Sequence, residues 1–303
     1  MPPTSFHTAI VDAFTRRAGE GNRAGVVLAA EGMSEATMVA VAYAAGASET
    51  AFALPPRDGA DLRLRYFTPT SEIEFCGHAT VATFHRLVET GALRAPGRYR
   101  LDTEAGMVDV ELEREGPSCR VWMATPRHEW ESSPFEATEL MLLLGGSVDM
   151  LDRDLPIECS GAKLFVPLAR RSDLAALTPR WDELARQGMA RHVRGYYVFT
   201  REAADPDHIT QGRYFAPAVG VREDPATGSA SGPLAEYLAL HGVLSLPATG
   251  GEARAWAEQG DAMGKPGRLL LEVSGTPERI ERARVGGTAV TVMDGALFVD
   301  VAR

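Results

Sequence analysis

The alternation of apolar and polar residues along the chain predicts a protein built from many short strands and a few helices. Strands are expected where apolar residues alternate, and helices where they recur at steps of three and four. The expected strands span residues 6–14, 24–30, 50–54, 62–67, 107–112, 120–124, 157–160, 163–168, 196–200, 268–273 and 281–301. The expected helices span residues 35–45, after Ser34 as N-cap, then 77 to a stop at Gly91, 134–144, 179–188 and 228–241.

Two stretches of this pattern repeat each other about half a chain apart. Tyr66-Phe67-Thr68-Pro69 precedes FCGHATVATFHRLVETG, and Tyr214-Phe215-Ala216-Pro217 precedes DPATGSASGPLAEYLALHG. The two Tyr-Phe pairs lie 148 residues apart in a chain of 303. Each copy runs from an expected strand through a glycine turn into an expected helix. The sequence therefore predicts an internal duplication, with two helix N-termini facing one cleft, where their free N–H groups suit an anionic small molecule.

The length of the chain exceeds the usual size of a single core, so two domains are expected. The duplication and the polar, turn-rich segment 125–134 place the boundary between them. Residues 1–127 are expected to form the first domain and residues 128–284 the second, with a final strand at about 285–303 packing back onto the first. The predicted fold class is α+β, with two pseudo-symmetric domains that each wrap a mixed or antiparallel sheet around one central helix.

Composition and charge remove several classes of function. The chain has 45% hydrophobic and 24% charged residues, as an ordinary globular protein does, and a formal net charge of −10. This charge disfavours nucleic acid and anionic membrane surfaces as partners, because both require clustered Lys and Arg. The three cysteines fit neither a disulfide framework nor a close-spaced metal site. The sequence contains no apolar block typical of a signal peptide or a membrane span, so a cytoplasmic protein is expected.

The two glycine turns are the first candidate binding sites. Gly77, followed by His78, allows the backbone to approach a ligand closely, and the N–H groups after it would bind a carboxylate. Taken alone, this turn is equally well explained as an ordinary helix start. The matching turn at Gly228 and Ser229 occupies the equivalent place in the second copy and favours the functional interpretation.

Two acidic residues lie close to these segments. The position of Asp224 favours a turn cap, with binding of a substrate amine or proton transfer as the alternative. Glu49 lies between the helix stop Gly46 and an apolar strand, so it is either an exposed strand start or a desolvated carboxylate with a raised pKa. A shift of 148 residues aligns Glu49 with Tyr197, so the second copy lacks this acid. This asymmetry favours one active centre built from unlike halves.

Cys76 lies beside the first glycine turn and aligns with Thr227 in the second copy. A pair of facing thiols can exchange a proton at carbon by a two-base mechanism, but only one thiol is present here. The two-thiol mechanism is therefore disfavoured. The sequence contains no zinc-protease, dinucleotide-binding, Walker or nucleophile-elbow motif.

Five segments of the chain, in this order, resemble the signatures of the PhzF-like proteins, named for the isomerase of phenazine biosynthesis. They are IVDAFTRRAGEGNRAGVVL, ASETAF, RYFTPTSEIEFCGHATVAT, VREDPATGSASGPLA and QGDAMGKPGRLLLEV, and they span Ile10 to Val273. The resemblance implies a diaminopimelate epimerase-like fold with the active site in the cleft between the two domains. It also implies a homodimer that uses no cofactor and no metal.

The resemblance also implies roles for individual residues. Glu49 corresponds to the catalytic glutamate that moves a proton between carbon atoms, and His78 and Asp224 correspond to the catalytic histidine and aspartate. The residues expected to bind the substrate, mainly through its carboxylate, are Gly77, Gly228, Ser229 and Asn22.

The leading hypothesis is a cofactor-independent isomerase that moves a proton on a small carboxylic acid, with Glu49 as acid and base. Two alternatives stay open. One is a racemase or epimerase that relies on Cys76, and the other is a non-catalytic protein that binds a small anion. The presence of Glu49, His78 and Asp224 together favours an enzyme.

Overall fold

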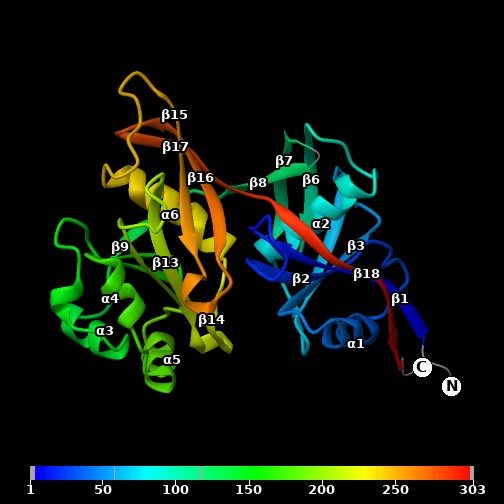
Figure 1. The fold of residues 1–303 in the computed structure, drawn as a ribbon, viewed down its shortest axis with the longest axis horizontal. Helices are drawn as coiled ribbons and strands as arrows, with labels where there is room; N and C mark the ends of the chain where they lie inside the picture. The colour runs from blue at the N-terminus through cyan, green and yellow to red at the C-terminus, as the bar shows by residue number, and fades with distance from the viewer. Residues whose placement is uncertain (1–3, 58, 117, 301–303) are drawn as a thin grey trace. The chain divides into compact units, whose positions relative to one another are not determined.

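The computed structural model describes residues 4–57, 59–116 and 118–300. The chain forms two compact units: one contains the chain up to Ala124 and the segment from Gly286 onward, and the other contains Thr125–Val285. The chain passes from one unit to the other within strand β8 (Ser118–Thr125) and again within β17 (Arg279–Gly287). Figure 1 shows the helices and strands of each unit. Among the described residues, no helix is long and apolar enough to cross a membrane.

The first unit contains a mixed sheet. Besides β8, its strands are β1 (Thr4–Ala13), β2 (Asn22–Val27), β3 (Glu49–Leu54), β4 (Leu62–Phe67), β5 (Glu72–Ile73), β6 (Gly97–Thr103), β7 (Gly106–Glu115) and β18 (Ala289–Val299). β1 pairs antiparallel with β18 and β2, β2 runs parallel to β3, and β3 pairs antiparallel with β4. β4 pairs antiparallel with β5 and parallel with β6, which begins the antiparallel run β6, β7, β8.

Helices cover both faces of this sheet. Helix α1 (Glu35–Ala45) begins after Ser34, whose side chain accepts a hydrogen bond from the Thr37 N–H, and ends at Gly46 in the left-handed conformation. It packs with Phe52 and other apolar residues of one sheet face. Helix α2 (Gly77–Glu89) lies on the other face and is buried from its first residue through Leu87. There the Tyr66 hydroxyl of β4 lies 2.6 Å from the Thr80 hydroxyl of α2.

The second unit has its own mixed sheet. Besides β17, its strands are β9 (Trp130–Ser132), β10 (Glu158–Ser160), β11 (Lys163–Leu168), β12 (Gly195–Thr200), β13 (His208–Ala216), β14 (Val221–Asp224), β15 (Gly251–Gln259) and β16 (Gly267–Thr276). Its helices are α3 (Ala137–Leu143), α4 (Arg171–Ala176), α5 (Trp181–Ala190) and α6 (Gly228–Leu240), with short 3-10 turns η1 (Val148–Met150), η2 (Pro217–Val219) and η3 (Asp261–Met263).

The two faces of the second sheet pack against different helices. Tyr197 and Tyr214 share an apolar core with Leu234 and other residues of α6. Phe215, next to Tyr214 in β13, belongs to a second core with residues of α3, α4 and α5. This division follows from the alternation of side chains along a strand.

The predicted duplication is confirmed by the order of strand pairing. In the first unit β2, β3, β4, β6 and β7 pair in the order parallel, antiparallel, parallel and antiparallel. In the second unit β11, β12, β13, β15 and β16 pair in the same order. The helices α2 and α6 each contain 13 residues and each follows a short strand that pairs with the preceding long one.

Most of the expected elements are present. β15, most of β13 and the short strands β5, β9 and β14 were not expected, and three further differences have clear causes. β6 was missed because only its last three residues are buried and its first half is rich in Arg and Tyr. The short helix α4 was missed because Leu174 is its only buried residue. The strand expected over 281–301 is two strands, β17 and β18, and residue 301 lies outside the described residues.

Candidate active site

Glu49 is the first residue of β3, directly after the turn that ends α1. Its neighbour in the parallel ladder is Ala24 of β2. The Glu49 side chain is 16% exposed, so its carboxylate is largely withdrawn from water. The alternative considered from the sequence, in which Glu49 is an exposed strand start, is therefore wrong.

His78 is the partner that the fold brings to Glu49. It is the second residue of α2, its side chain is 8% exposed, and its Nε2 lies 3.2 Å from Glu49 Oε2. On the other side of the ring, Nδ1 lies 3.2 Å from the Asn22 side-chain nitrogen Nδ2. In the neutral ring, with this amide as donor, Nδ1 accepts and the hydrogen on Nε2 is donated to Glu49. In the charged ring, which carries both protons, a half-turn of the Asn22 amide presents its oxygen to Nδ1.

The charges of this pair reinforce each other. Burial raises the pKa of the Glu49 carboxyl, but the hydrogen bond and charge of His78 lower it more, and the net pKa lies below its ordinary value. Burial lowers the pKa of His78, but its hydrogen-bonding partners, with the charged Glu49 carboxylate among them, outweigh this effect and raise the pKa well above its ordinary value. The raised pKa of Glu49 predicted from the sequence is therefore wrong. The prediction took into account the desolvation of Glu49 but not its contact with His78.

Cys76 lies against the same histidine. It precedes the first residue of α2, and its Sγ lies 3.4 Å from His78 Nδ1 and 3.7 Å from Nε2. Burial raises the pKa of the thiol more than His78 lowers it, so the uncharged thiol is the favoured form at neutral pH. A buried thiol in this form is a weak nucleophile and a weak base.

The start of α2 offers backbone donors next to these side chains. The first N–H groups of a helix have no intrahelical acceptor, and here the first N–H with such an acceptor is that of Thr80, which donates to the Cys76 carbonyl. The N–H groups of Gly77 and His78 precede it, whereas the Ala79 N–H makes a hydrogen bond to the Cys76 sulfur. Together with the positive end of the helix dipole, the N–H groups of Gly77 and His78 suit a carboxylate.

The three candidate residues of the second unit lie around the start of α6. Asp224 ends β14, Gly228 is the first residue of α6, and Ser229 is exposed on its first turn. The Asp224 carboxylate accepts a hydrogen bond from the Thr227 hydroxyl. This contact joins the end of β14 to the residue before α6. The cap expected for Asp224 stays a prediction.

Gln259 supports this loop and was not singled out as a site residue from the sequence. Its Nε2 donates to the Asp224 carbonyl over 2.7 Å, and its Oε1 accepts from the Thr227 N–H over 3.1 Å. The signal for it was the segment QGDAMGKPGRLLLEV, which begins at this residue. The side chain fixes the turn that leads into α6.

The strand register corrects the alignment of the two copies. Ala51 is opposite Tyr66 in the first unit, and Tyr197 is opposite Tyr214 in the second. Ala51 and Tyr197 are therefore equivalent residues of the two copies. Two residues earlier in each strand, Glu49 is equivalent to Gly195, so the alignment of Glu49 with Tyr197 was wrong by two positions. The helix starts do align Cys76 with Thr227, since each residue immediately precedes its helix.

Glu49, Cys76 and His78 also form a group whose ligand atoms all lie within 4.8 Å of one another, as in a metal site. Binding a metal would require the Cys76 thiol to lose its proton and His78 to give up a present partner. The hydrogen bonds that join the three side chains suit proton transfer directly. The sequence-based expectation of no metal stays a prediction.

Comparison with known proteins places this geometry in context. The family model described as phenazine biosynthesis-like protein matches residues 11–295. An uncharacterized isomerase of Deinococcus radiodurans is 37% identical over 97% of each chain. The trans-2,3-dihydro-3-hydroxyanthranilate isomerase of Pseudomonas fluorescens is 34% identical over 96% of this chain and 98% of its own.

Solved structures give the same result for the fold. The crystal structure of a PhzF family phenazine biosynthesis protein from Bacillus anthracis has a TM-score of 0.86 at 28% identity and covers 98% of this chain and 100% of its own. A hydroxyproline epimerase from Agrobacterium vitis has a TM-score of 0.62 at 14% identity over 99% and 92% of the two chains, a likeness of fold alone. The predicted α+β, diaminopimelate epimerase-like fold and the resemblance to PhzF-like proteins are confirmed.

Proposed function

We propose that this chain, which belongs to the phenazine biosynthesis-like protein family and is an isomerase, moves a proton between carbon atoms of a small carboxylic acid with Glu49 as acid and base. The observation that carries the proposal is the buried contact of 3.2 Å between Glu49 Oε2 and His78 Nε2 at the start of α2. A carboxylate held in this way is fixed in position and ionised, as a general base must be.

The proposed proton transfer uses these two side chains. The lowered pKa keeps Glu49 ionised at neutral pH, so it can take a proton from a carbon atom of the substrate. The protonated acid then returns the proton to a second carbon atom. His78 stays in contact through both steps and holds the carboxyl group in one orientation. No other proton carrier is needed for an isomerisation of this kind.

The helix start and the relatives support a proposal for the substrate class. The backbone N–H groups of Gly77 and His78, at the start of α2, suit a substrate carboxylate. The Pseudomonas fluorescens relative is named for an unsaturated cyclic amino-hydroxy acid, and we propose a substrate of this general type. The roles predicted for Asn22 in the first unit, and for Asp224, Gly228 and Ser229 in the second, belong to the same proposal, as does its independence of cofactors.

The test is hydrogen exchange in deuterated water. The purified chain is incubated with trans-2,3-dihydro-3-hydroxyanthranilate, other unsaturated cyclic acids and amino acids, and carbon-bound hydrogens are followed by NMR. Exchange or isomerisation is expected for at least one acid, and Glu49→Gln should reduce the rate by about 10²- to 10⁴-fold, the usual contribution of a general base. Glu31→Gln, at an exposed loop position, serves as the matched control.

A second candidate rests on the contact between Cys76 and His78. If the thiol carried the proton, Cys76→Ala would abolish exchange and Glu49→Gln would leave it. With Glu49 as the proton carrier, we expect Glu49→Gln to reduce exchange strongly and Cys76→Ala to retain it. If no compound of the panel exchanges a hydrogen while a carboxylic acid still binds, the non-catalytic binding protein is the better description.

A further inference from the structure

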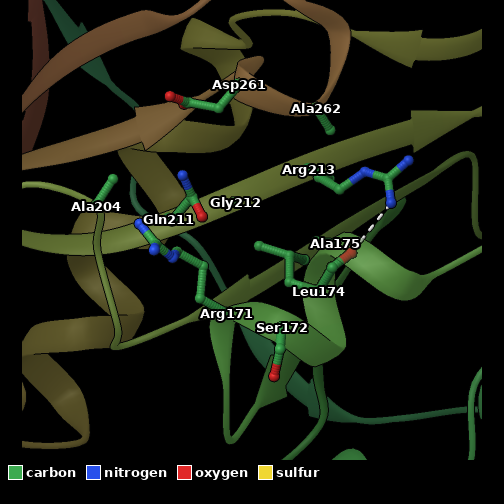
Figure 2. Close-up of a pocket in the computed structure, with 10 residues that line it drawn as sticks. All are labelled: Arg171, Ser172, Leu174, Ala175, Ala204, Gln211, Gly212, Arg213, Asp261 and Ala262. Atoms are coloured by element: carbon green, nitrogen blue, oxygen red, sulfur yellow. Dashed lines mark hydrogen bonds between the residues drawn. The ribbon is translucent and has the colours of Figure 1, made fainter.

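The second unit contains a cavity of about 500 Å³ that is separate from the start of α6. Its lining comes from α4, from β13, from η3 and from Ala204 in the loop between β12 and β13 (Figure 2). Gln211 and Arg213 of β13 alternate with Gly212 and Tyr214, and they share a face with Phe215, which packs toward α3, α4 and α5. The cavity therefore lies on the sheet face opposite α6, and none of the candidate active-site residues lines it.

One end of the cavity carries a positive charge that is available to a ligand. Arg171 is the exposed first residue of α4, and in Figure 2 its side chain extends toward Gln211. Within the described chain its guanidinium makes no ion pair or hydrogen bond, although its backbone N–H donates to Glu202. Arg213 differs, since it donates to Glu223 and to the carbonyls of α4 and the turn after it.

A negative charge lies on the other side of Gln211. Asp261, the first residue of η3, accepts hydrogen bonds of 3.1 Å from both terminal nitrogens of Arg268, which fix its orientation. A carboxylate has about four acceptor positions, so Asp261 can also accept from an ammonium group. Gln211 is itself held by Glu258, through a hydrogen bond of 3.1 Å. Contacts of the fold thus hold Asp261 and Gln211 in place, whereas the Arg171 side chain is held by no such contact within the described residues.

We propose that this cavity binds a small zwitterionic amino acid. The ligand carboxylate would pair with Arg171, and its ammonium group would pair with Asp261. Its apolar carbons would contact Leu174, Ala175 and Ala262, which supply the apolar part of the lining. A volume of about 500 Å³ lies within the usual range of small-molecule pockets. The site is independent of the proposed isomerase activity.

The test compares four probes with five carbon atoms each: L-norvaline, 5-aminopentanoate, pentanoate and pentylamine. Binding to the full chain is measured by calorimetry or ligand-observed NMR. At least one of the two zwitterions should bind, and the probes with a single charge should bind at least about tenfold more weakly, because each loses a charge-assisted hydrogen bond.

Variants locate the bound probe. Arg171→Gln and Asp261→Asn should each weaken binding by about 10- to 100-fold. Ala175→Trp should block the cavity while leaving both charges in place. This variant tests the site even if Asp261→Asn also disturbs the contact between Asp261 and Arg268. Arg170→Gln is the matched control, since Arg170 is exposed and adjacent but does not line the cavity.

Three results would overturn the proposal. The first is the absence of saturable binding for both zwitterions. The second is binding that persists unchanged in Arg171→Gln and Ala175→Trp. The third is binding that is lost in Glu49→Gln and kept in Arg171→Gln, which would assign the probe to the proposed isomerase site.

Discussion

Replacement of His78 with Gln is expected to lower kcat/KM and to move the acidic limit of its pH profile to higher pH. The His78 and Glu49 side chains are 8% and 16% exposed and lie 3.2 Å apart. A hydrogen bond to a charged group contributes about 1.5–3 kcal/mol, so kcat/KM at neutral pH should fall by about 10- to 150-fold. Burial raises the Glu49 pKa, and His78 lowers it again. Without His78 the Glu49 pKa is therefore higher, so that as the pH falls the carboxylate becomes protonated, and inactive as a base, at a higher pH than in the unaltered chain.

The assay is the pH profile of kcat/KM, measured with the compound that exchanges a hydrogen. His85→Gln provides the matched control, because His85 is also a buried histidine of α2 and lies 3.8 Å from Glu89. Its profile should coincide with that of the unaltered chain. If the acidic limit of the His78 variant also stays in place, then His78 does not set the ionisation of Glu49 and the reasoning is refuted.

Three other predictions concern stability. The lowered pKa of Glu49 and the raised pKa of His78 should stabilise the folded chain relative to His78→Gln most strongly between the ordinary pKa values of about 4.5 and 6.5. This advantage should vanish as pH falls through the folded Glu49 pKa or rises through the folded His78 pKa, in urea unfolding at a series of pH values. Tyr66→Phe should cost about 0.5–1.5 kcal/mol in the same assay, because it removes the hydrogen bond to Thr80. Gly195→Ala should cost about 1–3 kcal/mol, since its new methyl group would overlap the Tyr214 hydroxyl; an unchanged midpoint would contradict this packing.

Local signals in the sequence were sufficient for much of the fold. Ser34 and Gly46 mark the two ends of α1, and the structure uses both, as a side-chain cap and as a left-handed stop. Gly77 and Gly228 likewise begin the two central helices. These features depend on a few neighbouring residues, so the sequence contains the information needed to place them.

The electrostatics of the candidate site could not be predicted in the same way. The pKa of Glu49 depends on His78, which belongs to a different element and meets Glu49 only once α2 is packed on the sheet. The neighbouring residues in the sequence indicated the burial of Glu49 but not its contact with His78. The predicted direction of the pKa shift of Glu49 was therefore wrong. Gln259 illustrates the same limit, because its contacts with Asp224 and Thr227 join segments far apart in the chain.

The correction from Tyr197 to Gly195 strengthens the argument for a single working acid. The paired residues Tyr197 and Tyr214 of β12 and β13 lie two positions further apart in the sequence than the paired residues Ala51 and Tyr66 of β3 and β4. One constant offset therefore cannot align both strands of the two copies. In the corrected alignment the second unit has no side chain at the position of Glu49, and the Tyr214 hydroxyl occupies the space beside Gly195. A tyrosine whose pKa burial raises cannot replace a carboxylate as a base at neutral pH. The duplicated fold therefore retains the ionised acid in one copy only, which favours an isomerase with one carboxylate over a mechanism with two equivalent bases.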